Sequence, residues 1–186
     1  MFYYEDWPTP DWEQQGRLYV IKHAMSQLDL KGKVVLDVAA GYGYYSYMAL
    51  QMGAKHVTMF DRGAGFLKLA SENMEKKGIA NESYTTTHGD IFNLNFPAAD
   101  VVLCTGILYH TFRQQELLEK VKATGAETVL METMVLDTHR VCLMYRDDRK
   151  LHVPSPRLVE IMLAESGFQI TDQRPTLLNR LLYILK

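Results

Sequence analysis

Short apolar runs and longer amphipathic segments alternate along most of the chain. Strands are expected at Val34–Val38, His56–Phe60, Ser83–Thr87, Asp100–Cys104 and Thr128–Met131. Most gaps between these runs carry apolar residues at helical spacing. Helices are expected at Asp11–Leu28, Tyr44–Met52, Gly65–Lys77, Arg113–Ala123 and Ser155–Ser166. This alternation predicts an α/β fold whose parallel strands are joined by helical crossovers, with helices on both faces of the sheet.

Several helix ends carry their own signals. Gly53 and Gly78 follow expected helices at positions where a left-handed C-terminal cap is needed. Pro156 follows Ser155 as a first-turn proline follows an N-cap.

The end of the chain breaks the alternation of strand and helix. Phe168–Thr171 and Asn179–Leu185 both have strand patterns, and only Asp172–Leu178 lies between them. A link this short joins antiparallel neighbours but not parallel ones. We therefore predict a mostly parallel seven-stranded sheet whose last strand is antiparallel.

Length and composition favour one globular unit. The 186 residues, 47% of them apolar, suffice for one substantial core. We expect a single domain over residues 1–186, with a flap and helix at 1–30 and a core at 33–186. Apolar runs stay well short of the roughly 18 to 20 residues of a membrane span, and the acidic, aromatic N-terminus is unlike a signal peptide. These features predict a soluble, cytoplasmic protein with no membrane partner.

Cysteine and charge content exclude some classes of function. Cys104 and Cys142 lie far apart without metal-ligand spacing, which argues against a disulfide scaffold or a metal site. The net charge of −2 argues against a protein that holds nucleic acid by charge alone. One basic segment stands out, with Arg140, Arg146, Arg149, Lys150 and Arg157 diluted by Asp147 and Asp148. It is interpreted either as a solvated connector or as a surface for an anionic substrate.

The first predicted strand runs into a turn of small residues. Asp37 is followed by Ala39, Ala40, Gly41 and Gly43, and the next helix starts directly afterwards. In open parallel sheets, ligands bind at the carboxyl ends of the strands. Glycines let the backbone turn sharply and come close to a ligand, although a tight bend also needs them for purely structural reasons.

Two further acids follow the next two strands. Asp61 ends the second strand about 20 residues beyond the glycines, where a carboxylate accepts hydrogen bonds from ribose hydroxyls. Asp90, in the sequence HGD, is placed to accept from an adenine amine. Their structural alternatives are a strand-end turn residue for Asp61 and a helix cap or turn for Asp90.

Two nucleoside cofactors fit this pattern, a nicotinamide dinucleotide and S-adenosylmethionine. Asp37 precedes the glycines, where a carboxylate attracts an ammonium group but repels a pyrophosphate. The antiparallel last strand is also foreign to the usual dinucleotide fold. Together with Asp90, these features favour S-adenosylmethionine, and an oxidoreductase is kept as an alternative.

The residues from Lys33 to Lys186 resemble the class I S-adenosylmethionine-dependent methyltransferases. Their motif D-x-G-x-G-x-G is matched by Asp37, Gly41 and Gly43, with Ala39 at the first glycine. The resemblance implies a Rossmann-like fold, in which Asp37 and Gly41 face the methionine end of the cofactor, Asp61 its ribose and Asp90 its adenine. The predicted cofactor-binding residues are Asp37, Ala39, Gly41, Gly43, Asp61, Arg62, Asp90, Ile91 and Cys104. Cys104 is at the same time expected to be a core residue and not a nucleophile.

The fourth strand and its exit, DVVLCTGILYH, predict where the acceptor lies. The stretch lacks the NPPY or DPPY sequence of many methyltransferases that act on DNA or protein amines, so DNA is not expected as a partner. Tyr109 and His110 are the predicted catalytic residues. An unperturbed imidazole titrates near 6.5, so His110 is a candidate base, and a bond to the backbone is its structural alternative. Glu132, at the end of the fifth strand, is a second acid that could face the site.

A narrower resemblance is to the tRNA wobble-uridine carboxymethyltransferases, which use carboxy-S-adenosylmethionine. It rests on GILYH, TVLMETMVL and PSPRLVEIMLAESGF, and on the pair Asp11–Trp12 before the first helix. In that family a lysine on a long N-terminal extension, a tyrosine and a terminal arginine hold the cofactor carboxylate. Tyr109 matches the tyrosine, Arg174 or Arg180 matches the arginine, and this sequence does not contain the extension.

Three functions follow from these resemblances. The first is methyl transfer from S-adenosylmethionine to a small-molecule or tRNA acceptor. The second is carboxymethyl transfer from carboxy-S-adenosylmethionine to a tRNA wobble uridine, and the third is a non-catalytic cofactor-binding subunit. Acceptor specificity is expected to lie in the N-terminal dozen residues and in Thr138–Pro154.

Overall fold

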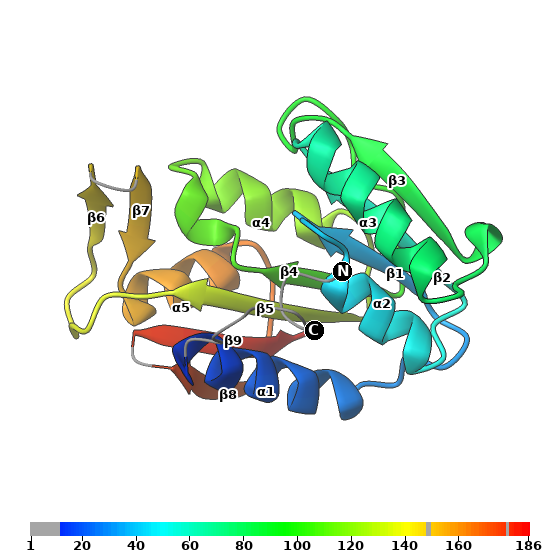
Figure 1. Cartoon of the computed structure of the whole chain (residues 1–186). Coiled ribbons are helices and arrows are strands. Elements are labelled where there is room, and N and C mark those ends of the chain that lie inside the picture. Colours follow the sequence, from blue (N-terminus) through cyan, green and yellow to red (C-terminus); the bar gives the residue numbers. More distant parts are fainter. Residues whose placement is uncertain (1–11, 148–149, 178) are drawn as a thin grey trace.

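The structure is a computed structural model that describes residues 12–147, 150–177 and 179–186. Its centre is a seven-stranded sheet with the order β3-β2-β1-β4-β5-β9-β8 (Figure 1). The strands of this sheet are β1 (Val34–Val38), β2 (His56–Asp61), β3 (Tyr84–His88), β4 (Val101–Thr105), β5 (Thr128–Met134), β8 (Ile170–Leu177) and β9 (Arg180–Leu185). The pairs among β1 to β5 are parallel, and β9 is antiparallel to both β5 and β8. The predicted α/β class and the antiparallel last strand are confirmed.

Within the described residues, five α-helices cover the two faces of the sheet. They are α1 (Trp12–Ser26), α2 (Tyr44–Gln51), α3 (Ala64–Lys76), α4 (Gln114–Lys122) and α5 (Pro156–Glu165). The first three pack on one face through buried residues such as Ile21, Met48 and Met74, and the last two on the other through residues such as Leu117 and Leu163. Short 3₁₀ turns lie at Asn81–Ser83 (η1) and Leu108–His110 (η2). None of the described helices is long and apolar enough to span a bilayer.

The predicted helix ends are confirmed. Gly53 and Gly78 both have positive φ, at 93° and 70°. The Ser155 hydroxyl accepts a hydrogen bond from the backbone N–H of Leu158, and Pro156 occupies the first turn of α5. One boundary differs from the prediction, because β8 continues through most of the segment expected to be a link. That edge strand is polar and contains Pro175, so its sequence looks like a connector.

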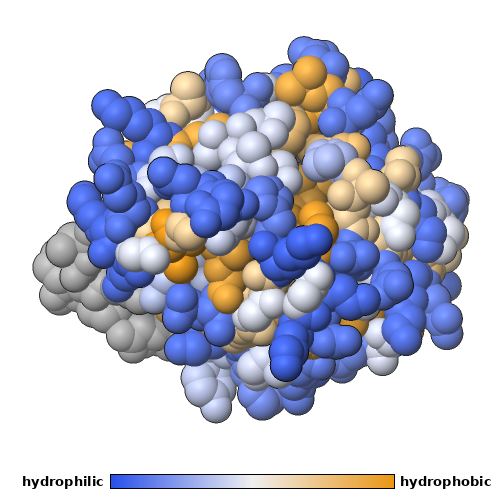
Figure 2. Space-filling view, turned by 90° about the vertical axis from the view of Figure 1, so that its right-hand side faces the viewer, coloured by the Kyte–Doolittle hydropathy of each residue, from blue (hydrophilic) through white to orange (hydrophobic). Residues whose placement is uncertain are grey.

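The basic segment contains a feature that the sequence pattern did not predict. Strands β6 (Leu143–Arg146) and β7 (Leu151–Pro154) pair antiparallel and form a separate hairpin. Figure 1 shows the hairpin beyond the carboxyl ends of β4 and β5. The face of the molecule at the other end of these strands carries mostly hydrophilic side chains, with smaller apolar groups between them (Figure 2). The end that bears the hairpin is also the end of the sheet to which the small-residue turn belongs.

Candidate active site

The turn after β1 adopts a conformation that excludes large side chains. Ala39, Gly41 and Gly43 all have positive φ, at 60°, 54° and 79°. A Cβ on Gly43 would meet Ala70 Cβ and Met59 Sδ at 3.0 Å, whereas around Gly41 the space is open. Ala39, which replaces the first glycine of the motif, adopts a left-handed conformation that costs an L-residue about 1 to 2 kcal/mol. Strain of this kind is typical of functional turns.

Asp61 at the end of β2 connects this turn to the next loop. One carboxylate oxygen accepts from the Gly41 N–H at 2.9 Å, and the other from the Gly63 N–H at 2.8 Å. The side chain is largely buried, at 7% exposure. The carboxylate therefore holds the backbones of two loops together at the carboxyl end of the sheet.

Asp37 lies beneath the turn and is almost entirely buried. The Ser46 hydroxyl donates to it at 2.6 Å. Burial raises the pKa of Asp37 to about 7, Ser46 opposes this rise, and the nearby charge of Asp61 adds to it. A carboxylate buried in this way is a site that a cationic group would stabilise.

A cavity of about 260 Å³ lies in front of the turn. Its described lining is Arg17, Ala39, Ala40, Gly41, Tyr42, Tyr44, Tyr45, Thr105, Gly106 and Tyr109. Of the predicted residues, Ala39, Gly41 and Tyr109 thus share one cavity, while Asp37 is not part of this described lining. Gly106 has a φ of 78°, and a Cβ there would come within 2.8 Å of the Arg17 guanidinium, so this wall also requires a residue without a side chain.

A cluster of charges forms one side of the cavity. Glu132 is fully buried in β5 and accepts from Arg17 of α1, at 3.0 and 2.8 Å, and from Arg180 of β9, at 2.5 and 3.0 Å. Arg180 also donates to the Tyr109 hydroxyl at 3.2 Å. Burial acts to raise the pKa of Glu132, but the two guanidiniums outweigh it and hold this pKa below its ordinary value. The cluster carries two cations and one anion beside a tyrosine hydroxyl.

Arg17 is the residue of this cluster that the sequence did not single out. It lies 115 positions before its partner Glu132, so no local pattern connects the two. The only sequence signal for Arg17 was the apolar spacing that predicts α1. A helix with this spacing packs against the core, and a charged residue that becomes buried on such a helix needs a partner. Of the two candidate arginines near the C-terminus, Arg180 joins the cluster, whereas Arg174 bonds to Asp172 and Gln27.

His110 follows Tyr109 in η2 and keeps contact with solvent. The two rings lie 4.4 Å apart. Partial desolvation, together with the positive charges of Arg62 and Arg180, lowers the pKa of His110 below 6.5. The imidazole is therefore neutral at neutral pH and able to accept a proton.

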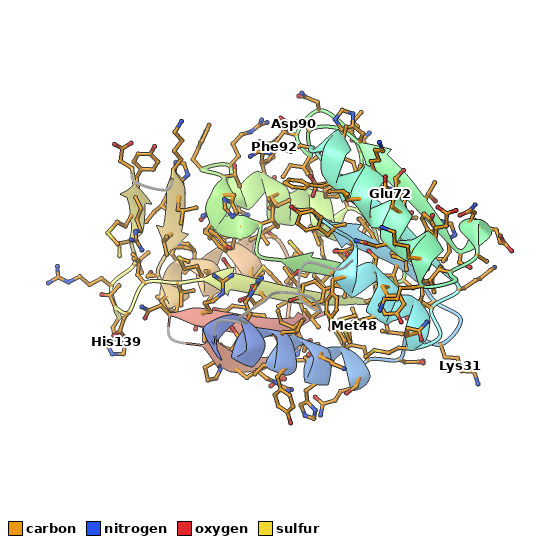
Figure 3. All side chains as sticks on the ribbon, in the orientation of Figure 1. Lys31, Met48, Glu72, Asp90, Phe92 and His139 are labelled. Atoms are coloured by element: carbon orange, nitrogen blue, oxygen red, sulfur yellow. The ribbon has the colours of Figure 1, made fainter. Side chains whose placement is uncertain are left out.

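The other predicted cofactor residues follow the neighbouring strands. Asp90, which is exposed, accepts from the Phe92 N–H at 2.8 Å, and this short turn lies beyond β3 (Figure 3). Ile91 is half-buried and Arg62 is exposed. Cys104 is 1% exposed in the core of β4, and burial, with the charges of Asp37 and Glu132, raises its pKa to about 12. Its thiol therefore stays protonated, as expected of a core residue.

This arrangement defines a class of protein. Residues 35–125 match the family described as "Methyltransferase domain". The strand order, with an antiparallel β9 between β5 and β8, differs from the 3-2-1-4-5-6 order of dinucleotide-binding folds. A methyltransferase from Burkholderia thailandensis, solved with bound S-adenosylhomocysteine, has the same fold, with a TM-score of 0.76 at 17% identity over 94% of this chain and 79% of that one. Residues 35–125 therefore form a methyltransferase domain, and the chain has the fold of S-adenosylmethionine-dependent methyltransferases.

Within this class, the chain is similar to proteins named tRNA U34 carboxymethyltransferase. The one from Helicobacter acinonychis is 33% identical over 69% of this chain and 49% of its own length. The one from Proteus mirabilis is 30% identical over 81% of this chain and 50% of its own length. The chain thus spans about half the length of the curated relatives it matches.

Asp37→Asn is expected to raise the Tm of the ligand-free protein at alkaline pH. The folded-state pKa of about 7 lies above the ordinary 3.8, so the protonated form is favoured in the fold. Relative to the neutral asparagine, the aspartate lowers the free energy of unfolding by an amount that grows between about pH 4 and 7. Above about pH 7 this difference stays constant, at up to about 4 kcal/mol. Thermal unfolding at about pH 5.5 and pH 8 should show a gap between variant and wild type that widens at pH 8. The exposed Asp29→Asn is the control, and a gap for Asp37→Asn that stays constant with pH would contradict the buried, proton-binding carboxylate.

Proposed function

We propose that this chain binds S-adenosylmethionine, or its carboxylated form, at the carboxyl ends of β1, β2 and β4 and transfers the one-carbon group to a tRNA base. The observation that carries the proposal is the set of acids at successive strand ends, Asp37, Asp61 and Asp90, beside the small-residue turn. The relatives named for a tRNA modification support an RNA acceptor. Such an acceptor would place the protein in the cytoplasm.

The residues present fit such a cofactor. Asp37 offers a carboxyl group whose charged form an ammonium group would stabilise, the turn offers open space and backbone N–H groups, and Asp61 offers a carboxylate for the ribose hydroxyls. Asp90 and Ile91 are proposed for the adenine, and Arg62 and Cys104 for the neighbouring wall. When bound, the cofactor would supply a carbon attached to a positively charged sulfur.

The chain's own contribution is chiefly orientation. Holding two reactants in line contributes roughly 7 to 11 kcal/mol in favourable cases. Tyr109 lines the cavity, and its hydroxyl has a direction fixed by Arg180. His110, neutral at neutral pH, is proposed to take the proton that the acceptor releases.

A second candidate, carboxymethyl transfer, is favoured by the charge cluster. Arg17 and Arg180 both bond to the carboxylate of Glu132, and Arg180 also donates to the Tyr109 hydroxyl. Arg17 and Tyr109 line the cavity, where a guanidinium and a hydroxyl would together hold a cofactor carboxylate.

Calorimetry with S-adenosylmethionine, S-adenosylhomocysteine and carboxy-S-adenosylmethionine tests both candidates. A folded protein that binds none of them refutes the proposal. Binding without turnover on unmodified tRNA would favour the alternative of a non-catalytic subunit. Methylation of a small molecule but not of tRNA would exclude the RNA acceptor while leaving the cofactor site intact.

Tyr109→Phe separates methyl from carboxymethyl transfer. If the hydroxyl binds a carboxylate, its loss should weaken the binding of carboxy-S-adenosylmethionine by about tenfold or more, because a hydrogen bond to a charged group contributes about 1.5 to 3 kcal/mol. S-adenosylmethionine affinity should change less than about twofold. Tyr19→Phe, on an exposed tyrosine of α1, is the matched control. Equal losses for both cofactors, or a wild type that prefers S-adenosylmethionine, would count against the carboxylated cofactor.

A further inference from the structure

The β6–β7 hairpin is fixed to the body of the protein by three sets of hydrogen bonds. The Gln114 side-chain amide donates to the carbonyl of His152 at 2.6 Å and to that of Leu108 at 3.0 Å. The Leu136 N–H donates to the Pro154 carbonyl at 2.9 Å. At the base, the Ser155 N–H donates to the Cys142 carbonyl at 2.8 Å. The hairpin is therefore held in a defined position, with an inner face toward the body of the protein and an outer face toward solvent.

The inner face of the hairpin contacts the wall of the cofactor cavity. Leu151 and Val153 are buried, at 4% and 2% exposure, and pack against Tyr109. A second cavity of about 410 Å³ separates the hairpin from the end of β5, and Met144, Arg146 and Val153 contribute to its lining. The hairpin therefore lies beside the site where transfer is proposed.

The outer face of the hairpin exposes apolar and aromatic side chains that a folded protein usually buries. Tyr145 is 52% exposed, and Phe112, from the turn before α4, is 72% exposed. The ring of His152 lies between them, 4.9 Å from Tyr145 and 5.9 Å from Phe112. Val141 and Leu143 are exposed on the same segment, whereas Met144 lines the second cavity on the inner face. Tyr145 and His152 on the hairpin and Phe112 beside it are tilted to one another, and exposed aromatic rings of this kind offer faces on which planar groups can stack.

Positive charge is concentrated in this part of the chain. Residues 138–157 contain five basic and two acidic residues, whereas the remaining sequence contains fifteen basic and twenty acidic ones. His139, in the loop that leads to the hairpin, lies at the same end of the molecule (Figure 3). The protein as a whole is weakly acidic, so this segment is locally more basic than the rest of the sequence, with Arg157 paired to Glu160 on α5.

We propose that the outer face of the β6–β7 hairpin binds unpaired nucleotides of an RNA acceptor. Tyr145 and Phe112 stack on bases, and Arg140 and Lys150 contact phosphates. This inference rests on the proposed RNA acceptor and names the surface that holds it. A second copy of the chain fits the surface less well, because a two-fold contact would bring the same basic residues of both copies together.

The probe is an RNA stem-loop with an unpaired, uridine-containing loop, and a fully paired duplex of similar length is its comparison. Fluorescence anisotropy of the full chain should show tighter binding of the stem-loop. Phe112→Ala/Tyr145→Ala should weaken that binding by about tenfold or more, since stacking on one aromatic side chain accounts for about 1 to 3 kcal/mol per base. The matched control is Tyr19→Ala/Lys68→Gln, which changes an exposed tyrosine on α1 and a lysine on α3.

Arg140→Gln/Lys150→Gln tests the phosphate contacts. Each lost contact to a single strand should reduce the slope of log affinity against log salt by about 0.7, so the double variant should lose about 1.4. Hydrogen exchange of the wild type gives a readout that does not depend on variants. Backbone amides of Leu143–Arg146 and Leu151–Val153 should gain protection when the stem-loop is added.

Several results would overturn the inference. They are equal affinity for stem-loop and duplex, equal losses in the aromatic variant and its control, and hairpin amides that gain no protection. A change of oligomeric state in the aromatic variant, with unchanged RNA affinity, would make the hairpin a contact between copies instead. Calorimetry with S-adenosylhomocysteine on the same samples separates this outcome from failure of the cofactor site, because a chain that binds the nucleoside but not RNA refutes only the RNA surface.

Discussion

Glu132→Ala is expected to lower the free energy of unfolding by about 3 to 5 kcal/mol, because it removes the anion that two buried guanidiniums share. The carboxylate is fully buried and accepts from Arg17, Arg180 and Thr176, while the two arginine side chains are each 12% exposed. Without Glu132, both guanidiniums lose, at low exposure, the carboxylate that they share. Urea unfolding followed by circular dichroism measures the loss.

The pH dependence of this effect has a defined sign. The pKa of Glu132 lies below its ordinary value of 4.5, so its stabilisation is present above that value and is lost as the pH falls through the folded-state pKa. The difference between wild type and variant should therefore be largest near neutral pH and should shrink in acid.

An exposed ion pair provides the control for this substitution. Glu127 pairs with Lys33 at 2.9 Å but is 70% exposed, so Glu127→Ala should cost no more than about 1 kcal/mol. In a double-mutant cycle, Arg17→Met combined with Glu132→Ala should cost less than the sum of the single changes. Additive effects, or a loss from Glu132→Ala no greater than that from Glu127→Ala, would show that the cluster is not a coupled unit.

The sheet was predictable because its central strands are buried on both faces. β1 is apolar except for Asp37 and β4 except for its last residue, Thr105, and such runs remain visible without knowledge of their neighbours. The turn after β1 was predictable for a related reason, because positive φ at Gly41 and Gly43 restricts the residue types that fit. Asp61 was predictable from its position at the end of the next strand, about 20 residues beyond the glycines of that turn.

The elements that the pattern missed are exposed or depend on distant partners. β6 presents mostly exposed residues, so burial imposes no alternation on its sequence. β8 is an edge strand with polar residues and Pro175, a composition that protects sheet edges and equally suits linkers. The pairing of Glu132 with both Arg17 and Arg180 is set only by the tertiary fold, which brings α1, β5 and β9 together at the carboxyl end of the sheet.

Asp61→Ala is expected to weaken binding of S-adenosylhomocysteine by at least about 100-fold. The proposed bonds to two ribose hydroxyls are charge-assisted, and each contributes about 1.5 to 3 kcal/mol. The same carboxylate accepts from the N–H groups of Gly41 and Gly63, so its loss also frees the two loops that shape the cavity. Isothermal calorimetry gives the affinity, and the Tm of each variant reports how far the loops affect the fold.

Asp61→Asn separates the loss of the proposed ribose bonds from the loss of the backbone bonds that hold the two loops, and Asp90→Ala is the comparison. The asparagine keeps one oxygen for a backbone N–H but directs an N–H₂ group at the other donor, so it should lose most of the affinity while costing less stability than alanine. Asp90 is exposed and accepts a single backbone bond, and its removal should weaken binding by only about tenfold. If Asp61→Ala bound the nucleoside within about threefold of wild type, the carboxylate would act only as a loop brace, and the ribose would have to be held elsewhere.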